Sequence, residues 1–300
     1  MYDIIEKCPD AQELSRLFLE CFPGIIRKPS TVAAIISHPG NRLLTCGQAG
    51  AILWNGNVVI MLCVLPQYRG RGIGSALLDA LETRLAQAGF DEIRFCDGFD
   101  YLTPGIPDWA DIPAYRHNRA FFEKRGYFHA WGESECVDMA MELSDFRDDG
   151  HRVGESLGGI TYRFAGEEDT RRVLACIDDG YPEFTGYYRN PALYAEAPAG
   201  GERVLIAETD GLVAGALMVC FETEQRGVGS VGCTVTRPAY RNRGIATELV
   251  RLGTGEFREK RIPKAYLGYT YTEIVPMYAR SGYAVSMRYF MGVKRIQKPE

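Results

Sequence analysis

The sequence predicts a mixed α/β fold made of two tandem copies of one domain, each with a mixed central sheet flanked by helices. Three observations support this prediction. The chain has 300 residues, more than most single domains. A glycine-rich segment occurs once in each half, between a strand pattern and a helix pattern. Strand and helix patterns then alternate in both halves, which is typical of a mixed α/β domain.

An internal repeat defines the two copies. The segment YRGRGIGSALL at 68–78 recurs as YRNRGIATELV at 240–250, and six of the 11 positions are identical. A proline stands two residues before each tyrosine, at Pro66 and Pro238. Further along, FFEKRGY at 121–127 is echoed by MYARSGY at 277–283. Two landmarks in the same order indicate a duplicated domain.

The order of predicted elements that the two copies share begins with a buried strand and an amphipathic helix. Residues 58–65 form an unbroken apolar run, as in a strand buried on both faces. Apolar residues then recur every four positions from Ile73 to Leu85, which predicts a helix that ends near Gly89. A strand at 92–96 and a short helix before Gly126 follow.

The second copy repeats this order. Residues 228–236 predict the buried strand, and Ile245, Leu249 and Leu252 predict the helix after it. A strand at 264–267 and a short helix before Gly282 complete the pattern. Between the copies, residues 145–159 are polar and carry four glycines, a composition that suits an exposed linker. We therefore predict an N-terminal domain at 1–144, a linker at 145–158 and a C-terminal domain at 159–300.

Composition excludes several classes of function. The net charge is −5 and neither half is basic, so no nucleic-acid partner is expected. No stretch of 18 apolar residues exists to span a bilayer, so no membrane partner is expected either. The nine cysteines form no Cys-x-x-Cys pair and the four histidines have no ligand spacing, which argues against a metal site and for reduced thiols. The start of the chain lacks the pattern of a signal peptide, and we predict a cytoplasmic protein.

The glycine-rich turn has a specific physical use. Glycine permits a tight turn and lets a phosphate approach main-chain N–H groups closely. The first N–H groups of the following helix have no internal partner and carry the positive end of its dipole. Arginines at 69, 71, 241 and 243 add positive charge, and Ser75 and Thr247 offer hydroxyls. Each turn therefore predicts an anion site.

Two common phosphate motifs do not match. No Gly-Lys-Ser/Thr ending is present, which a nucleoside triphosphate loop requires. No Gly-x-Gly-x-x-Gly with an acidic residue about 20 positions later is present, which a dinucleotide site requires.

Both turns instead resemble the acyl-CoA-binding motif of the GNAT acetyltransferases, Arg/Gln-x-x-Gly-x-Gly/Ala. VLPQYRGRGIG at 64–74 and TRPAYRNRGIA at 236–246 match it. The later aromatic helix that ends in Gly-Tyr, at 118–127 and 276–283, resembles the other signature of the family. The resemblance covers nearly the whole chain, in a tandem arrangement similar to that of mycothiol synthase-like enzymes.

This resemblance implies that acetyl-CoA is the co-substrate. Its diphosphate would bind the turn amides and its pantetheine arm would pair with the end of the preceding strand. In the first copy, the implied residues are Leu62, Cys63, Val64, Arg69, Gly70, Arg71, Gly72, Ile73, Gly74 and Ser75. In the second copy, they are Thr234, Val235, Thr236, Arg241, Asn242, Arg243, Gly244, Ile245, Ala246 and Thr247.

The family transfers the acetyl group directly to an amine, and a late-helix tyrosine usually protonates the departing thiolate. That position holds Tyr278 in the second copy and Phe122 in the first. A phenol donates a proton and a phenyl ring does not, which favours the C-terminal domain as catalytic. Tyr115 or Tyr127 remain alternatives in the first copy. The base stays unassigned between a water chain and the carboxylates of Asp178, Asp179, Glu222 and Glu224.

The first copy carries 16 additional residues around 99–114, rich in proline, aromatic and acidic residues. This segment either covers the mouth of the first CoA slot or is a surface excursion.

The resulting hypothesis is an N-acetyltransferase that acts on a primary amine of a small molecule, as a monomer or homodimer, with an active C-terminal domain. Two alternatives stay open: an acyl-CoA-binding regulatory protein without turnover, and an enzyme that uses a different acyl group. The sequence does not identify the acceptor.

Overall fold

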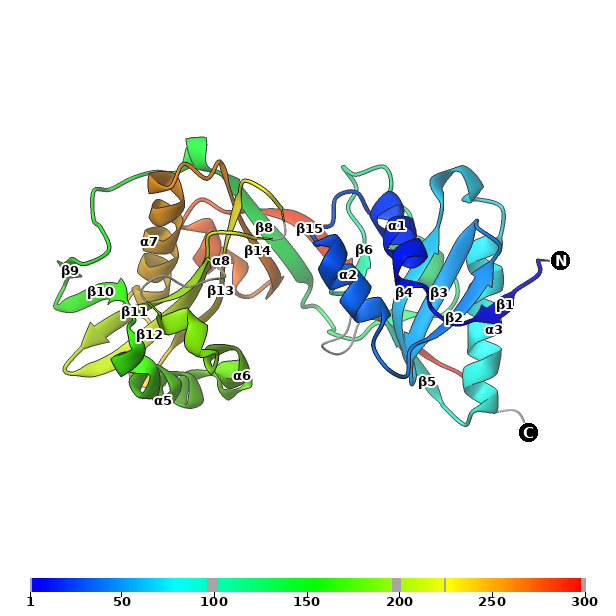
Figure 1. Cartoon of the computed structure of the whole chain (residues 1–300), viewed down its shortest axis with the longest axis horizontal. Coiled ribbons are helices and arrows are strands. Elements are labelled where there is room, and N and C mark those ends of the chain that lie inside the picture. The colour runs from blue at the N-terminus through cyan, green and yellow to red at the C-terminus, as the bar shows by residue number, and fades with distance from the viewer. Residues whose placement is uncertain (1, 96–101, 196–200, 224, 298–300) are drawn as a thin grey trace. The chain divides into compact units, whose positions relative to one another are not determined.

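The computed structural model describes residues 2–95, 102–195, 201–223 and 225–297 (Figure 1). The chain divides into two compact units. Unit 1 contains Met1–Cys136 and Met287–Glu300, and unit 2 contains Val137–Ser286. Each unit has a mixed sheet with helices on both faces, which confirms the predicted fold class.

Unit 1 is built on a seven-stranded sheet in the order β1-β2-β3-β4-β5-β16-β7. Strands β4 and β5 are parallel, and the other neighbours are antiparallel. The strands are β1 (Ile5–Lys7), β2 (Arg42–Cys46), β3 (Gly50–Asn55), β4 (Val58–Val64), β5 (Glu92–Phe95), β7 (Phe128–His129) and β16 (Gly292–Arg295).

Alternating side chains assign the helices of unit 1 to opposite faces of its sheet. Leu43 packs with helices α1 (Ala11–Cys21) and α2 (Pro29–Ile36), whereas the next residue, Leu44, packs with α3 (Ile73–Gln87) and α4 (Asn118–Glu123). Because successive strand residues point to opposite faces, the helices cover both. Ile73, Leu77, Leu81 and Leu85 of α3 are all buried, as the sequence pattern predicts.

Unit 2 has a longer sheet, in the order β15-β8-β14-β13-β12-β11-β10-β9. Its strands are β8 (Cys136–Glu142), β9 (Ser156–Leu157), β10 (Ile160–Phe164), β11 (Glu202–Thr209), β12 (Leu212–Cys220), β13 (Val228–Thr236), β14 (Lys264–Tyr271) and β15 (Ala284–Phe290). The unit 1 end of β15, at Tyr289 and Phe290, pairs with β6 (Ile106–Pro107), which also belongs to unit 1.

Helices cover both faces of this sheet as well. Helices α5 (Thr170–Gly180) and α6 (Thr185–Tyr188) pack against Val204 and Ile206 of β11. Helices α7 (Ile245–Glu259) and α8 (Val275–Ala279) pack against the alternate residues Leu205 and Ala207. The parallel pair of this sheet, β13 and β14, is the counterpart of β4 and β5.

One strand in each unit comes from a part of the chain outside that unit's own sequence copy. Strand β8 follows the elements of unit 1 in sequence but lies between β14 and β15 in the sheet of unit 2. Strand β16 ends the described chain but lies between β5 and β7 in unit 1. The units therefore differ from the predicted 1–144 and 159–300 division, because residues 137–144 belong to unit 2 and residues 287–300 to unit 1.

The segment at 145–158, expected as a linker, lies within unit 2. Its strand β9 pairs with β10, and the imidazole of His151 contacts the carboxylate of Glu248 on α7. Asp148 also accepts from Arg258 at 3.2 Å. The chain crosses between units at 136/137 and 286/287 instead, so the glycines here serve turns inside one unit.

A buried carboxylate stabilises the start of α5. The Asp169 carboxylate, fully buried, accepts from Arg163 and Arg172 at 2.9 and 3.0 Å and from the Gly166 N–H at 3.0 Å. The Arg163 hydrogen bond holds the pKa of Asp169 below its usual range. The stability from this lowered pKa is present above the unfolded carboxyl pKa and is lost as pH falls through the folded one.

We expect Asp169→Asn to lower the free energy of unfolding of unit 2 by about 2 kcal/mol at pH 7, because Arg163 and Arg172 lose one of their two carboxylate partners and keep only Glu208. Chemical denaturation at pH 7 and in acid should show the difference shrinking as the wild-type carboxylate is protonated. A constant difference at every pH would contradict the electrostatic explanation.

Candidate functional site

The two glycine-rich turns adopt the same backbone conformation. In unit 1, Gly70 has φ 72° and Gly72 has φ 85°, and Gly72 is the residue just before α3. In unit 2, Asn242 has φ 62° and Gly244, just before α7, has φ 80°. No side chain caps either helix start. The first amides of both helices therefore remain available to an anion.

The arginines of these turns have two different tasks. The Arg69 guanidinium donates to the carbonyls of Val64, Ala114 and Cys21, at 2.9, 3.1 and 3.2 Å. Arg241 likewise donates to the carbonyls of residues 236 and 180, at 3.2 and 3.0 Å. Each of these arginines fixes its turn to the preceding strand and to the first helix region, rather than standing free around the anion site.

The other arginine of each turn remains exposed. Arg71 stacks on the ring of Tyr68 at 5.6 Å, and Arg243 stacks on Tyr240 at 5.1 Å. Both guanidinium groups face solvent beside the helix start, where positive charge attracts a phosphate.

The parallel strand pair of unit 2 separates beyond its first residues. Strand β13 pairs with β14 through residues 228–230, and the two strands are not joined beyond them. In unit 1, β4 pairs with β5 through Val58 and Val59, and the described part of β5 ends there, at Phe95. Residues 234–236 therefore offer main-chain groups that the parallel neighbour does not occupy, which a ligand can pair with.

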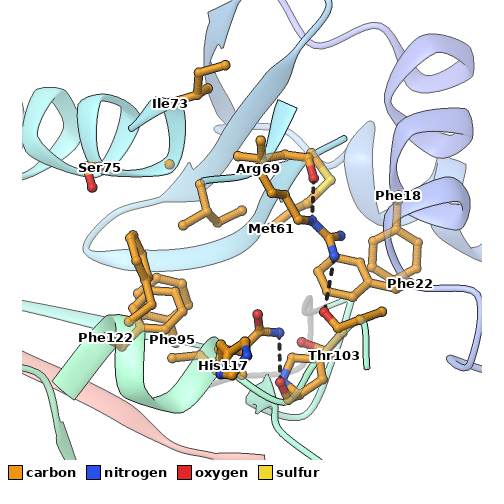
Figure 2. Close-up of a pocket in the computed structure, with 18 of the residues that line it drawn as sticks. Phe18, Phe22, Met61, Arg69, Ile73, Ser75, Phe95, Thr103, His117 and Phe122 are labelled. Carbon is orange, nitrogen blue, oxygen red and sulfur yellow. Dashed lines mark hydrogen bonds between the residues drawn. The ribbon is translucent and has the colours of Figure 1, made fainter. Parts of the chain in front are cut away.

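A cavity of about 570 Å³ lies in unit 1 beside β4 (Figure 2). Met61 of β4 lies on one side of it, and Phe95, Phe122 and His117 lie on the other (Figure 2). Of the residues predicted for the first site, the cavity brings together Leu62, Val64, Arg69, Gly70, Gly72, Ile73, Gly74 and Ser75. The predicted Cys63 is not in the lining, and its buried side chain packs with residues of α1 and α2.

Helix α1 and the additional segment complete the cavity wall. Phe18 and Phe22 come from the end of α1 (Figure 2). Thr103 and five further residues of the segment at 99–114 also line it, although residues 99–101 lie outside the described chain. The aromatic residues of α1 carry no motif, and only their helical spacing was visible in the sequence.

In unit 2, the hydroxyl of Tyr278 lies 3.1 Å from the Thr234 hydroxyl of β13. Tyr278 is only 5% exposed, and this burial raises its pKa. The phenol therefore stays protonated at neutral pH. The repeat aligns Tyr278 with Phe122 and Thr234 with Leu62, so unit 1 has an apolar pair where unit 2 has two hydroxyls.

Two of the four candidate carboxylates of unit 2 are engaged elsewhere. Asp179 pairs with Arg237 at 3.0 Å, and Asp178 accepts from the Thr185 hydroxyl at 2.5 Å. Glu224 lies outside the described residues. These contacts give no support to either aspartate as the base. The described residues hold no cluster that would bind a metal ion and no helix long and apolar enough to cross a membrane.

Comparisons with known proteins agree with this geometry. Residues 34–128 match the model of an acetyltransferase (GNAT) domain, and residues 170–283 match that of the acetyltransferase (GNAT) family. The chain therefore belongs to the GNAT acetyltransferases, as a tandem of two GNAT domains. No curated protein matches the sequence.

Solved structures share the tandem fold. A tandem GNAT protein from the clavulanic acid biosynthesis pathway is 15% identical over the whole of both chains, with a TM-score of 0.68. A GCN5-related N-acetyltransferase from Sphaerobacter thermophilus is 20% identical, with a TM-score of 0.63 over 98% of this chain and 96% of its own.

A fungal multi-domain GH3 β-N-acetylglucosaminidase with a GCN5-related glucosamine N-acetyltransferase region is 18% identical, with a TM-score of 0.72 over 98% of this chain. This chain spans only 38% of that protein. At these identities the likeness concerns the fold alone.

Proposed function

We propose that the protein transfers an acetyl group from acetyl-CoA to a primary amine of a small molecule, with unit 2 as the active copy. One observation favours unit 2 as the active copy. The protonated, buried phenol of Tyr278 lies beside β13, the strand that the pantetheine arm would follow.

In unit 2, the amides at the start of α7 would bind the diphosphate, with Arg243 beside them. The edge of β13 from Thr234 to Thr236 would pair with the pantetheine amides. A main-chain N–H of this strand would stabilise the oxyanion as the amine adds to the acetyl carbon. Helix α8 holds the Tyr278 hydroxyl next to Thr234 of this strand.

Tyr278 then protonates the sulfur as the carbon–sulfur bond breaks. The products are the acetylated amine and the free thiol of coenzyme A. The phenol recovers its proton from the amine nitrogen through water, so that no net charge remains in the site. The raised pKa of Tyr278 keeps the donor loaded across the neutral range.

A second candidate role applies to unit 1. Its cavity of about 570 Å³ joins the turn, the strand edge and α4, which favours binding of an acyl-CoA there. Phe122 and Leu62 leave that site without the two hydroxyls of unit 2. On this evidence, unit 1 is an acyl-CoA-binding module that need not turn its ligand over.

Adding a negative charge to each glycine-rich turn tests whether that turn binds the diphosphate. A Cβ at Gly70 would meet nothing within 4 Å, and the matching residue of unit 2 is Asn242 in the same left-handed conformation. Gly70→Asp therefore adds a negative charge without a steric clash, and Gly70→Asn is its neutral control, with the same left-handed backbone strain. In unit 2, Asn242→Asp changes the charge with almost no change in shape.

We expect isothermal titration calorimetry to find two acetyl-CoA sites in the wild type. Each aspartate should weaken the site of its own unit at least about tenfold, equal to about 1.4 kcal/mol, and Gly70→Asn should weaken neither. Release of coenzyme A with a panel of primary amines then measures turnover. Absence of binding in the wild type would refute the proposed function.

A further inference from the structure

The cavity of unit 1 contains a histidine that the family signature does not involve. His117 immediately precedes α4 and faces the cavity, across from Met61 of β4 (Figure 2). It lies five positions before Phe122, the residue that stands where unit 2 has its phenol.

Hydrogen bonds on both sides fix the turn that carries His117. The Asn118 side chain donates to the Pro107 carbonyl at 2.8 Å, which ties the first residue of α4 to β6. On the other side, Tyr115 is fully buried and its hydroxyl accepts from the Gly24 N–H at 3.1 Å. The imidazole is therefore held at the cavity wall by its neighbours.

Several other polar groups of the described lining have partners within the protein. The Arg69 guanidinium donates to three carbonyls, and the Thr103 hydroxyl donates to the Gly105 carbonyl. The Tyr68 ring lies under the Arg71 guanidinium in the turn. In the described part of the wall, His117 is the side chain that carries an imidazole, which has both a donor and an acceptor nitrogen in its neutral form.

Asp108 supplies a carboxylate on the segment before this turn. Burial raises the pKa of Asp108, and the backbone N–H and the positive charge of Arg119 partly offset that effect. The charged groups around this turn include Asp108, Arg116, Arg119 and Glu123, with Arg69 on the cavity side.

We propose that His117 is the proton-transfer residue of unit 1, in place of the phenol that Phe122 lacks, so that unit 1 also catalyses acetyl transfer. This inference rests on the proposed acetyl-CoA chemistry and assigns turnover to the second copy of the fold.

The step conserves protons. As the amine nitrogen bonds to the acetyl carbon, neutral His117 accepts one proton from that nitrogen. As the carbon–sulfur bond breaks, the imidazolium donates this proton to sulfur. The products are the amide and the thiol of coenzyme A, and His117 returns to its neutral form.

The test isolates unit 1 by silencing unit 2 with Tyr278→Phe and Asn242→Asp together. In this background, we expect His117→Gln to lower the rate of coenzyme A release about 100-fold and to leave the acetyl-CoA dissociation constant within twofold. His38→Gln, far from the cavity lining, is the matched control.

A second measurement does not depend on the acceptor. An imidazole beside the sulfur should convert part of the bound coenzyme A thiol to thiolate at neutral pH, as in cysteine–histidine pairs. Ultraviolet absorbance should show this thiolate in the background protein and lose it in His117→Gln. Equal thiolate absorbance in both proteins, or an unchanged rate in His117→Gln, would overturn the role of His117.

The two proposals fail differently. Wild-type protein that binds acetyl-CoA but acetylates no amine, with the thiolate signal still dependent on His117, would count against the proposed acceptor class. Turnover that persists in unit 2 but is absent from the silenced background would count against His117 alone.

Discussion

Replacing Tyr278 by Phe is expected to lower the turnover of unit 2 about 100-fold while leaving its affinity for acetyl-CoA unchanged. The substitution removes one oxygen atom from a buried ring and keeps the packing of α8. A lost general acid affects only the transition state, so the rate constant falls and the ground-state affinity does not. Coenzyme A release, measured in a Gly70→Asp protein to exclude unit 1, gives the value.

Tyr283 provides the matched control for this variant. It lies in the same core, and its buried hydroxyl lies 2.9 Å from that of Thr254. Tyr283→Phe should cost about 1 kcal/mol of stability because the Thr254 hydroxyl loses a partner, with no change in turnover. Equal turnover in Tyr278→Phe and wild type would remove Tyr278 from the mechanism.

The pH dependence follows from the raised pKa of Tyr278. Its protonated form is the active donor, so this contribution to the rate is fully present below the usual phenol pKa. It is lost only as pH rises above that value, because burial moves the pKa upward. Any loss of turnover on the acid side must therefore come from another group, such as the amine or the base.

The repeat and its local elements were predictable from the sequence, because strands, helices and glycine turns are set by short-range patterns. The αL glycines at 72 and 244 and the buried face of α3 are examples. Helix α8 and its tyrosine followed from the second landmark in the same way.

The direction of long side chains was not predictable. Arg69 and Arg241 appeared to be phosphate ligands, yet they satisfy carbonyls at the ends of β4 and β13. Cys63 belongs to the predicted strand, but alternation turns its side chain toward α1 and α2. The cavity wall also depends on Phe18 and Phe22, which only the tertiary fold brings to the turn.

The sheet to which β8 and β16 each belong was also not predictable from the sequence. Both β8 and β16 are single strands at the end of a copy, and neither contains a local signal that selects a sheet. Pairing between distant strands depends on the whole fold, so a division by sequence order assigns both strands to the wrong neighbour.

A proline substitution in β16 should destabilise unit 1, and one in β8 should destabilise unit 2. Val293 is 4% exposed in β16, paired with Arg94 on one side and Phe128 on the other. Val293→Pro removes a ladder hydrogen bond from the interior of the unit 1 sheet, at a cost of about 3 kcal/mol or more. We expect unit 1 to unfold at lower denaturant concentration and its acetyl-CoA site to disappear from calorimetry, while the site of unit 2 remains.

Met139→Pro is the reciprocal variant. Met139 is fully buried in β8, between β14 and β15, although it precedes the predicted boundary at 144. If sheet membership governs stability, this substitution should unfold unit 2, abolish the turnover that depends on Tyr278 and leave acetyl-CoA binding in unit 1. Loss of unit 1 instead would show that β8 belongs to the copy that precedes it in the chain, and the exchange would be refuted.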